Sequence, residues 1–387
     1  MSTAWGVAAV TVLTSLPVFL PGAANGLISA EFGWSSARIG AVLATYWLAS
    51  LSGAYVSKRA AVPPAVERAL AVALCATCLG LLSAALVPAV GLWVSSTVGG
   101  FAYGYTQPHT NALLMQRCAP RLRALAFGLK QAAVPAATLL ASAAVPMLAG
   151  PAGWRPVFAG TAVVCGAGGV GLLLRHGAPG TRPPAAARDR TGVPLRGQVF
   201  LTALGCAGFF GAMVGNGLAG FLVLTLTSRG ASLSDAGAVA TAGAALNIVV
   251  RLAAGWLAGR RPEAAWAALT GLFVVGVAGT ALLAHGPLTV SAVGALLAYG
   301  GGWGWAGLLH YLIGLPYAGR EQRATAHSQM GVSLGAAAGP MVCGLLFTVD
   351  PAAAWWVLTA GGATAAVCVL VARRHDPRST GAVGRRR

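Results

Sequence analysis

The chain has 387 residues, of which 57% are hydrophobic and only 9% are charged, with a formal net charge of +18 and a mean hydropathy of +0.73. Soluble domains carry about 25% charged residues. This composition therefore excludes a soluble globular protein and indicates an integral membrane protein.

Twelve apolar stretches are long enough to cross a bilayer, because a spanning helix needs about 20 apolar residues. They do not alternate apolar with polar residues, so helices are expected rather than the strands of a barrel. In chain order they lie at about 5–27, 37–56, 69–89, 91–115, 124–148, 156–174, 198–227, 235–258, 265–284, 288–315, 325–348 and 353–372.

The basic residues are concentrated on one side of the expected membrane. If both ends are cytoplasmic, 21 of the 26 lysines and arginines fall in cytoplasmic segments; only Arg38, Arg155 and Arg229 fall outside, while Lys130 and Arg251 lie within spans. This distribution is typical of the positive-inside rule. We therefore expect a multi-pass protein of the plasma membrane with cytoplasmic N- and C-termini. The charge marks topology, so no nucleic-acid partner is expected.

A polar stretch rich in proline and arginine divides the spans six and six and is typical of a flexible linker. The expected division is an N-terminal six-helix bundle (1–174), a cytoplasmic linker (175–197), a C-terminal six-helix bundle (198–372) and a basic cytoplasmic tail (373–387). The fold class is thus an all-α membrane protein with 12 transmembrane helices in two pseudo-symmetric bundles.

The two halves also repeat each other. Gly53 to Arg59, after the second span, parallels Gly255 to Arg261, after the eighth. With twelve spans, a long central loop and this glycine-to-basic signature, the chain resembles the major facilitator superfamily over essentially its whole length. The resemblance implies two rocking halves around a substrate near the midplane. It also implies gating loops at Lys58, Arg59, Arg260 and Arg261.

The signature departs from the family pattern at its acidic position. Ser57 and Gly259 stand where the family has an aspartate. The usual charge pair between helices is therefore absent or rebuilt, with Glu67 or Glu263 as substitutes.

In the fourth and fifth spans, His109 and the pair Lys130-Gln131 are candidate substrate contacts. The resemblance places the fourth span along the cavity, where His109 is also a candidate for the coupling proton. Alternatively, His109 is a hydrogen-bonded residue near the cytoplasmic end. Lys130 either faces the cavity as a cation or extends its stem toward the headgroups.

In the eighth span, Arg251 lies about nine residues from Arg260, roughly 13 Å by the helical rise, and so near the midplane of a core about 30 Å thick. An intramembrane cation is costly and indicates a partner or a substrate. No acid lies within a span, so a mobile anion is the expected partner, and Arg251 is the predicted anchor. The alternative is an arginine bonded to backbone carbonyls.

Asn247 lies one turn before Arg251 on the same face. The pattern Asn247-x-x-x-Arg251-x-x-x-Gly255 resembles that of monocarboxylate and oxalate-type carriers. In the monocarboxylate group the Asn247 position is often acidic, so the asparagine here argues against proton coupling through that position. In the tenth span, His310 and Tyr311 are further candidate contacts. His310 occupies the repeat position of His109 and is the second candidate for the coupling proton. Alternatively, it too is a hydrogen-bonded residue near the cytoplasmic end.

These features predict a secondary active transporter with rocker-switch alternating access for a small organic anion such as a carboxylate. The alternative is a multidrug or amphipathic-compound efflux carrier, with Tyr103, Tyr105, Trp303 and Trp305 making contacts. No enzymatic activity, catalytic residue, metal site or cofactor is expected. The expected partners are a small-molecule substrate, the lipid bilayer and a coupling proton, with the protein as a monomer.

Overall fold

The computed structural model describes residues 1–59, 66–148, 153–176, 195–347 and 349–380, and its secondary structure there is helical throughout. The linker predicted at 175–197 and the tail after 380 lie largely outside the described residues. The first seven helices are α1 (Ser2–Ala23), α2 (Asn25–Phe32), α3 (Ser36–Arg59), α4 (Val66–Leu86), α5 (Pro88–Arg117), α6 (Pro120–Leu148) and α7 (Arg155–His176).

The second half of the chain begins with α8 (Leu195–Ser228), α9 (Leu233–Arg260) and α10 (Ala265–His285). One interrupted span follows, made of α11 (Leu288–Leu297), the π-helical turn η2 (Ala298–Gly302) and α12 (Ala306–Gly314). The last long helices are α13 (Glu321–Phe347) and α14 (Pro351–Arg374), with short 3₁₀ turns η1 (Pro262–Ala264) and η3 (Pro377–Thr380).

Twelve spanning units result when the interrupted span is taken as one and α2 is set aside, which agrees with the expected fold. Ten of the described helices are each long and apolar enough to cross a membrane. The other two units are α5, which carries a polar run at 106–111, and the interrupted span, whose pieces are individually short.

The first span ends earlier than predicted. That span was expected to run to residue 27, but α1 ends at Ala23 and α2 follows as a separate helix. Pro21 lies inside the last turn of α1 and lacks the N–H of other residues, and Gly33, with φ 63°, ends α2 in the left-handed conformation.

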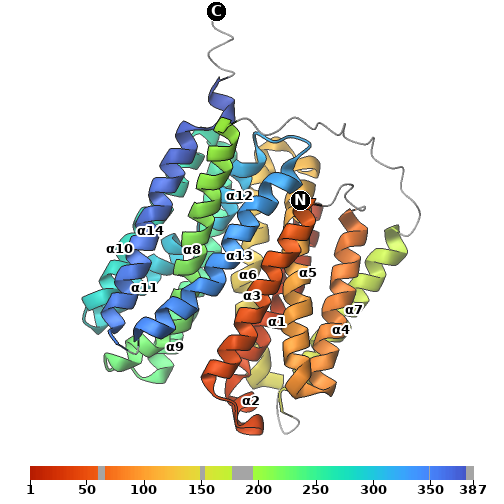
Figure 1. Cartoon of the computed structure of the whole chain (residues 1–387), viewed down its shortest axis with the longest axis vertical. Helices are drawn as coiled ribbons and strands as arrows, with labels where there is room; N and C mark the ends of the chain where they lie inside the picture. Colours follow the sequence, from red (N-terminus) through yellow and green to blue (C-terminus); the bar gives the residue numbers. More distant parts are fainter. Residues whose placement is uncertain (60–65, 149–152, 177–194, 348, 381–387) are drawn as a thin grey trace, which may run out of the picture.

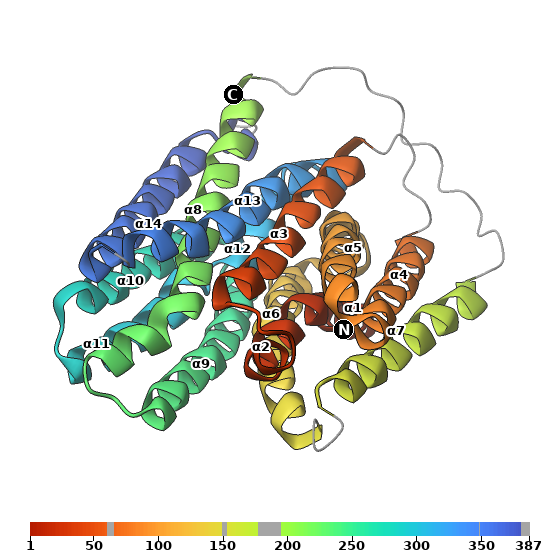
Figure 2. The ribbon, with the colours of Figure 1, turned by 60° about the horizontal axis from the view of Figure 1, so that its bottom comes forward.

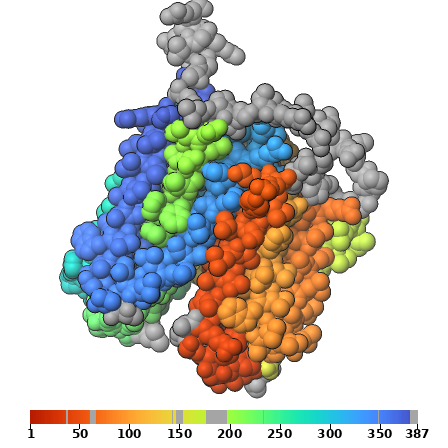
Figure 3. All heavy atoms as spheres, viewed as in Figure 1, coloured from red at the N-terminus to blue at the C-terminus, as the bar shows by residue number. Residues whose placement is uncertain are grey.

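The helices α1–α7 gather on one side of the molecule and α8–α14 on the other (Figure 1). The N-terminus and the end of α14 lie toward the same end of the bundle, which we call the terminal face. The two sides meet along α3 and α13, which lie directly against each other (Figure 3), and along α6 and α9, which are neighbours in the view turned by 60° (Figure 2).

Two glycines allow α6 and α9 to touch backbone to backbone. A Cβ atom at Gly128 would lie 2.5 Å from the carbonyl oxygen of Arg251, and one at Gly255 would lie 2.6 Å from that of Ala124. Small residues at such positions permit close helix approach in membranes. This contact brings the start of α6 beside the segment of α9 that carries Arg251.

Candidate functional site

Arg251 projects from α9 into the contact between the two sides, where only 2% of the residue is exposed. Its Nη1 atom donates to the carbonyl oxygen of Gln131 in α6 at 2.5 Å, and its Nη2 atom donates to that of Trp303 at 2.6 Å. The guanidinium also lies 6.0 Å from the centroid of the Trp303 ring. Its Nε atom is buried and has no hydrogen-bond partner. The side chain therefore bonds to backbone carbonyls, as the alternative interpretation held, while its Nε donor stays unpaired.

Lys130 is fully buried, with 0% of the residue exposed. Its Nζ atom donates to the carbonyl oxygen of Gln107 in α5 at 3.0 Å and to Oδ1 of Asn111. The lysine stem thus turns toward α5 and does not extend toward the headgroups. Neither atom of the Gln107 amide has a partner, and Nδ2 of Asn111 has none either.

Gln131 and His310 face each other across the contact between the two sides. Nε2 of Gln131 lies 3.5 Å from Nδ1 of His310 in α12, and that ring nitrogen is 2.8 Å from the carbonyl oxygen of Ala306. Nε2 of His310 is buried without a partner. We call Gln107, Asn111, Lys130, Gln131, Arg251 and His310 the central cluster. Its members come from α5 and α6 on one side and from α9 and α12 on the other.

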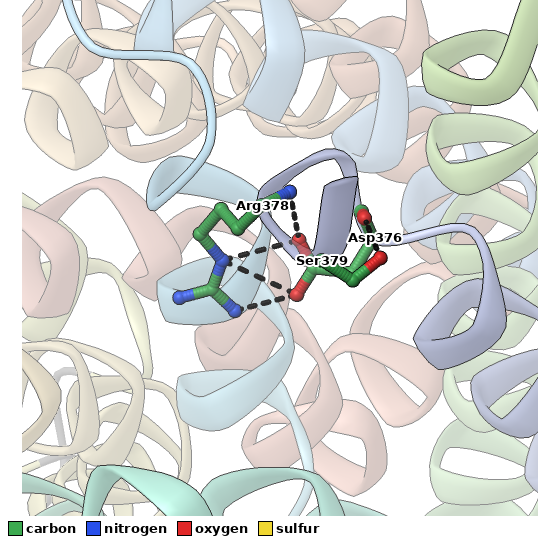
Figure 4. Close-up of polar contacts among 3 residues, drawn as sticks. All are labelled: Asp376, Arg378 and Ser379. Carbon is green, nitrogen blue, oxygen red and sulfur yellow. Dashed lines mark hydrogen bonds and ion pairs between the residues drawn. The ribbon is translucent and has the colours of Figure 1, made fainter. Parts of the chain in front are cut away.

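The central cluster contains two basic side chains and no acid. The seven acids in the described part of the chain lie at helix ends or in connections. Glu67 pairs with Arg117, Glu31 with Arg155, and Asp376 with Arg378. The last pair joins two residues of one short segment, where the Ser379 hydroxyl also donates to the carbonyl oxygen of Asp376 (Figure 4). No described carboxylate therefore offsets the two buried cations.

Asn247 lies beside the cluster and faces η2. Its Nδ2 atom donates to the carbonyl oxygen of Tyr299 at 2.5 Å, while Oδ1 is buried without a partner. A π-helical turn breaks the regular ladder of backbone hydrogen bonds. Asn247 thus satisfies one carbonyl of the interrupted span, a contact that the sequence pattern did not reveal.

Two predicted contacts lie apart from the cluster. Nδ1 of His109 is 2.7 Å from the carbonyl oxygen of Tyr105 and 3.3 Å from Oγ of Ser57 in α3. Tyr311 packs its ring against Phe127, with the centroids 6.3 Å apart. Among the seven predicted substrate contacts, the structure brings together Lys130, Gln131, Arg251 and His310.

The four predicted gating cations make different contacts. Nζ of Lys58 lies 3.2 Å from Nδ1 of His327 in α13, which joins the two sides. Arg59 and Arg260 instead lie over the rings of Tyr55 and Trp256 in their own helices, at 4.4 and 4.1 Å from the centroids. Arg261 forms the C-cap of α9.

Hydrogen bonds between uncharged groups also join α3 and α13, and they were not predicted. Gln322 of α13 donates from Nε2 to the carbonyl oxygen of Ser57 at 3.0 Å, and the hydroxyls of Ser50 and Ser333 lie 2.9 Å apart. Glu67, which was a candidate to replace the missing acid, pairs with Arg117 within the first half. At Ser57, the described contacts between the halves are therefore hydrogen bonds without a carboxylate.

Two of the aromatic residues named for the alternative function are buried among the helices. Tyr103 is 4% exposed and lies against Tyr46 and Trp47, and Trp305 stacks on Phe273. A groove of about 330 Å³ along α9 and α10 has only apolar lining, formed by Val250, Ala253, Ala254, Leu257, Ala268, Gly271 and Leu272. It offers no donor to an anion.

Comparison with known proteins supports the architecture. The chain matches the family model described as Major Facilitator Superfamily over residues 7–317. No curated protein matches it.

Several solved transporters share the fold. The chain is similar to the proton:xylose symporter XylE (16% identity, TM-score 0.72, 95% of each chain). It is also similar to the human organic anion transporter TETRAN (18% identity, TM-score 0.68, 95% of this chain and 99% of that one). A third match is a bacterial homologue of the iron transporter ferroportin in an outward-facing state (13% identity, TM-score 0.72, 95% and 98%). At these identities the similarity shows the fold alone.

Proposed function

The chain belongs to the major facilitator superfamily, and from that premise we propose that it carries a small organic anion, such as a carboxylate, across the plasma membrane. The fold is that of multi-pass secondary transporters, in which two helical halves alternate access to a site between them. The proposed site is the central cluster, with Arg251 and Lys130 as its positive anchors.

One observation carries this proposal: two buried cations, contributed by opposite sides of the molecule, share the central cluster with no described carboxylate. Buried charges are costly unless they are paired. The oxygens that hold Lys130 and Arg251 are neutral backbone and amide oxygens, so the positive charge itself remains unbalanced. An anionic substrate would balance it.

The free polar atoms of the cluster favour the same chemistry. Nε of Arg251 and Nδ2 of Asn111 are buried donors without an acceptor. A guanidinium binds a carboxylate through two parallel hydrogen bonds, which suits recognition of a planar anion. The spacing of Asn247, Arg251 and Gly255, similar to that of monocarboxylate and oxalate-type carriers, is in keeping with such a substrate.

Coupling to protons and the orientation in the membrane are further parts of the proposal. Histidine titrates in the physiological range, and Nε2 of His310 lies in the cluster without a partner, so His310 is the proposed proton carrier. The excess of basic residues at the terminal face supports cytoplasmic termini.

Uptake into proteoliposomes tests the anion site. The substrate panel contains mono- and dicarboxylates, a neutral sugar and a lipophilic cation. We expect accumulation of a carboxylate, which Arg251→Gln and Lys130→Gln each reduce by about tenfold or more, because a hydrogen bond to a charged group contributes about 1.5–3 kcal/mol. Arg38→Gln, which removes a cation that lies over Trp34 at the start of α3, is the matched control.

Two results would overturn the proposal. The first is wild-type carboxylate transport by both the Arg251 and the Lys130 variants. The second is transport of the lipophilic cation with no carboxylate transport at all, which would favour the efflux alternative.

A further inference from the structure

The carbonyl oxygen of Gln131 has no helical donor because of a proline four residues later. In a regular α-helix this carbonyl would accept from the N–H of residue 135. That residue is Pro135, which has no N–H. Gln131 is 4% exposed, so water does not readily replace the missing donor. The sequence of α6 therefore creates a buried carbonyl that needs a donor from outside its own helix.

Arg251 supplies that donor from the other side of the molecule. Its Nη1 atom is 2.5 Å from the Gln131 oxygen, and its Nη2 atom is 2.6 Å from the carbonyl oxygen of Trp303. Trp303 follows η2 and precedes the start of α12 at Ala306, so its carbonyl also lies outside a regular helix. One guanidinium thus satisfies two carbonyls that the helices leave open, one on each side of the contact.

We propose that Arg251 and the Gln131 carbonyl form a latch between the two halves, with Pro135 as the positioning residue that exposes the carbonyl. The inference deepens the proposed function, on which its substrate-linked part rests. A carboxylate is a stronger acceptor for a guanidinium than a neutral carbonyl. An anion that takes the Nη1–Nη2 edge of Arg251 displaces the Gln131 carbonyl and so releases the latch.

In this structure the two halves are in contact at the terminal face. Lys58 contacts His327, and Gln322 donates to Ser57, both between α3 and α13. Arg251 adds a bond between α6 and α9, whose backbones touch at Gly128. Breaking the latch lowers the cost of separating the halves, so a protein without it opens this face more readily.

Pro135→Ala tests the latch because it returns an N–H to α6 that competes with Arg251 for the Gln131 carbonyl. Hydrogen–deuterium exchange is measured without substrate on the full-length protein in lipid nanodiscs. We expect exchange at the end of α3 and the start of α13 to become about three- to tenfold faster, the range of one net hydrogen bond. Pro340→Ala, which removes the proline inside α13, is the control for loss of a helix-interior proline.

A double-mutant cycle separates the latch from simple straightening of α6. Exchange is compared for wild type, Pro135→Ala, Arg251→Gln and the double variant. If the latch exists, Pro135→Ala has no further effect once Arg251 is replaced, because both variants remove the same bond. Equal effects of Pro135→Ala in both backgrounds, or no effect in either, would overturn the inference.

Transport kinetics give a second readout with opposite signs for the two variants. A freed guanidinium no longer has to leave a carbonyl, so Pro135→Ala is expected to lower the KM for the carboxylate about three- to tenfold. Arg251→Gln raises it. If no carboxylate is transported, the proposed function fails while the exchange cycle still decides the latch. If Pro135→Ala leaves both exchange and KM unchanged while Arg251→Gln abolishes transport, the latch fails and the function stands.

Discussion

Gln322 of α13 donates a hydrogen bond to the carbonyl oxygen of Ser57 in α3, across a sequence separation of 265 residues. Ser57 stands where the family signature has an aspartate. The link between the halves at this point therefore depends on an amide and a backbone carbonyl instead of a charge pair. Neutral hydrogen bonds are weaker than charge-assisted ones, which favours a gate that opens at low cost.

Gln322→Ala is expected to loosen this gate. It leaves the buried Ser57 carbonyl without its described donor, so amides at the end of α3 should exchange about three- to tenfold faster, which corresponds to one net hydrogen bond. Gln116→Ala is the control, because Gln116 is an exposed glutamine at the end of α5. Equal exchange at the end of α3 in both variants would contradict the prediction.

Lys130→Met is expected to remove stabilisation of the protein by its substrate. A ligand that binds only the folded state stabilises it by about 2.7 kcal/mol at a concentration of 100 Kd. Thermal unfolding in detergent, with and without the transported carboxylate, measures this difference. The wild-type Tm should rise with the anion, and the Tm of the variant should rise much less at the same anion concentration. An equal rise in Tm for Lys130→Met and the wild type argues against a role for this lysine in binding.

Gly128→Ala is expected to destabilise the contact between α6 and α9. The added Cβ atom would lie 2.5 Å from the backbone oxygen of Arg251, which cannot move as a flexible side chain does. Overpacking of this kind costs about 1–3 kcal/mol. Gly271→Ala in α10 is the control, since its Cβ would meet nothing within 4 Å. Thermal unfolding should show a lower Tm for Gly128→Ala alone.

Asn247→Ala is expected to affect stability more than substrate affinity. Its amide donates to the Tyr299 carbonyl at the π-helical turn, and a buried acceptor left without a donor costs about 1–3 kcal/mol. Thermal unfolding and the KM for the carboxylate are measured on the same preparation. A large rise in KM with an unchanged Tm would instead support the original prediction that Asn247 contacts the substrate.

His310→Gln is expected to abolish proton-driven accumulation of the substrate while passive transport continues. Glutamine keeps hydrogen-bonding capacity but carries no titratable proton. Proteoliposomes with an imposed pH gradient should show accumulation for the wild type and only equilibration for the variant. His109→Gln, which alters the other histidine named as a proton candidate, is tested alongside. Loss of accumulation only in His109→Gln would assign proton coupling to His109, which lies beside Ser57, instead of His310.

Much of the architecture follows from local features of the sequence. Apolar length alone predicts spans such as 235–258, observed as α9 (Leu233–Arg260). A membrane imposes this simplicity, because backbone groups in lipid must be satisfied within each helix. The tenth span carries consecutive glycines at 300–302 and is interrupted there by η2. The separate helix α2 was missed because apolar length alone does not show where one helix ends and the next begins.

In the candidate site, too, some features follow from the sequence and others only from the tertiary structure. That Arg251 and Lys130 are intramembrane cations without an intramembrane acid follows from composition and spacing, because a helix places its residues at fixed depths. Which atoms they touch depends on how helices far apart in the chain pack together. Only the tertiary structure places Arg251 on the Gln131 carbonyl, turns Lys130 toward Asn111, and separates His109 from His310. The contact between Arg251 and Gln131 depends on the close backbone approach at Gly128 and on the Gln131 carbonyl that Pro135 leaves free. Arg251 and Gln131 lie far apart in the chain, so local sequence features do not determine their contact.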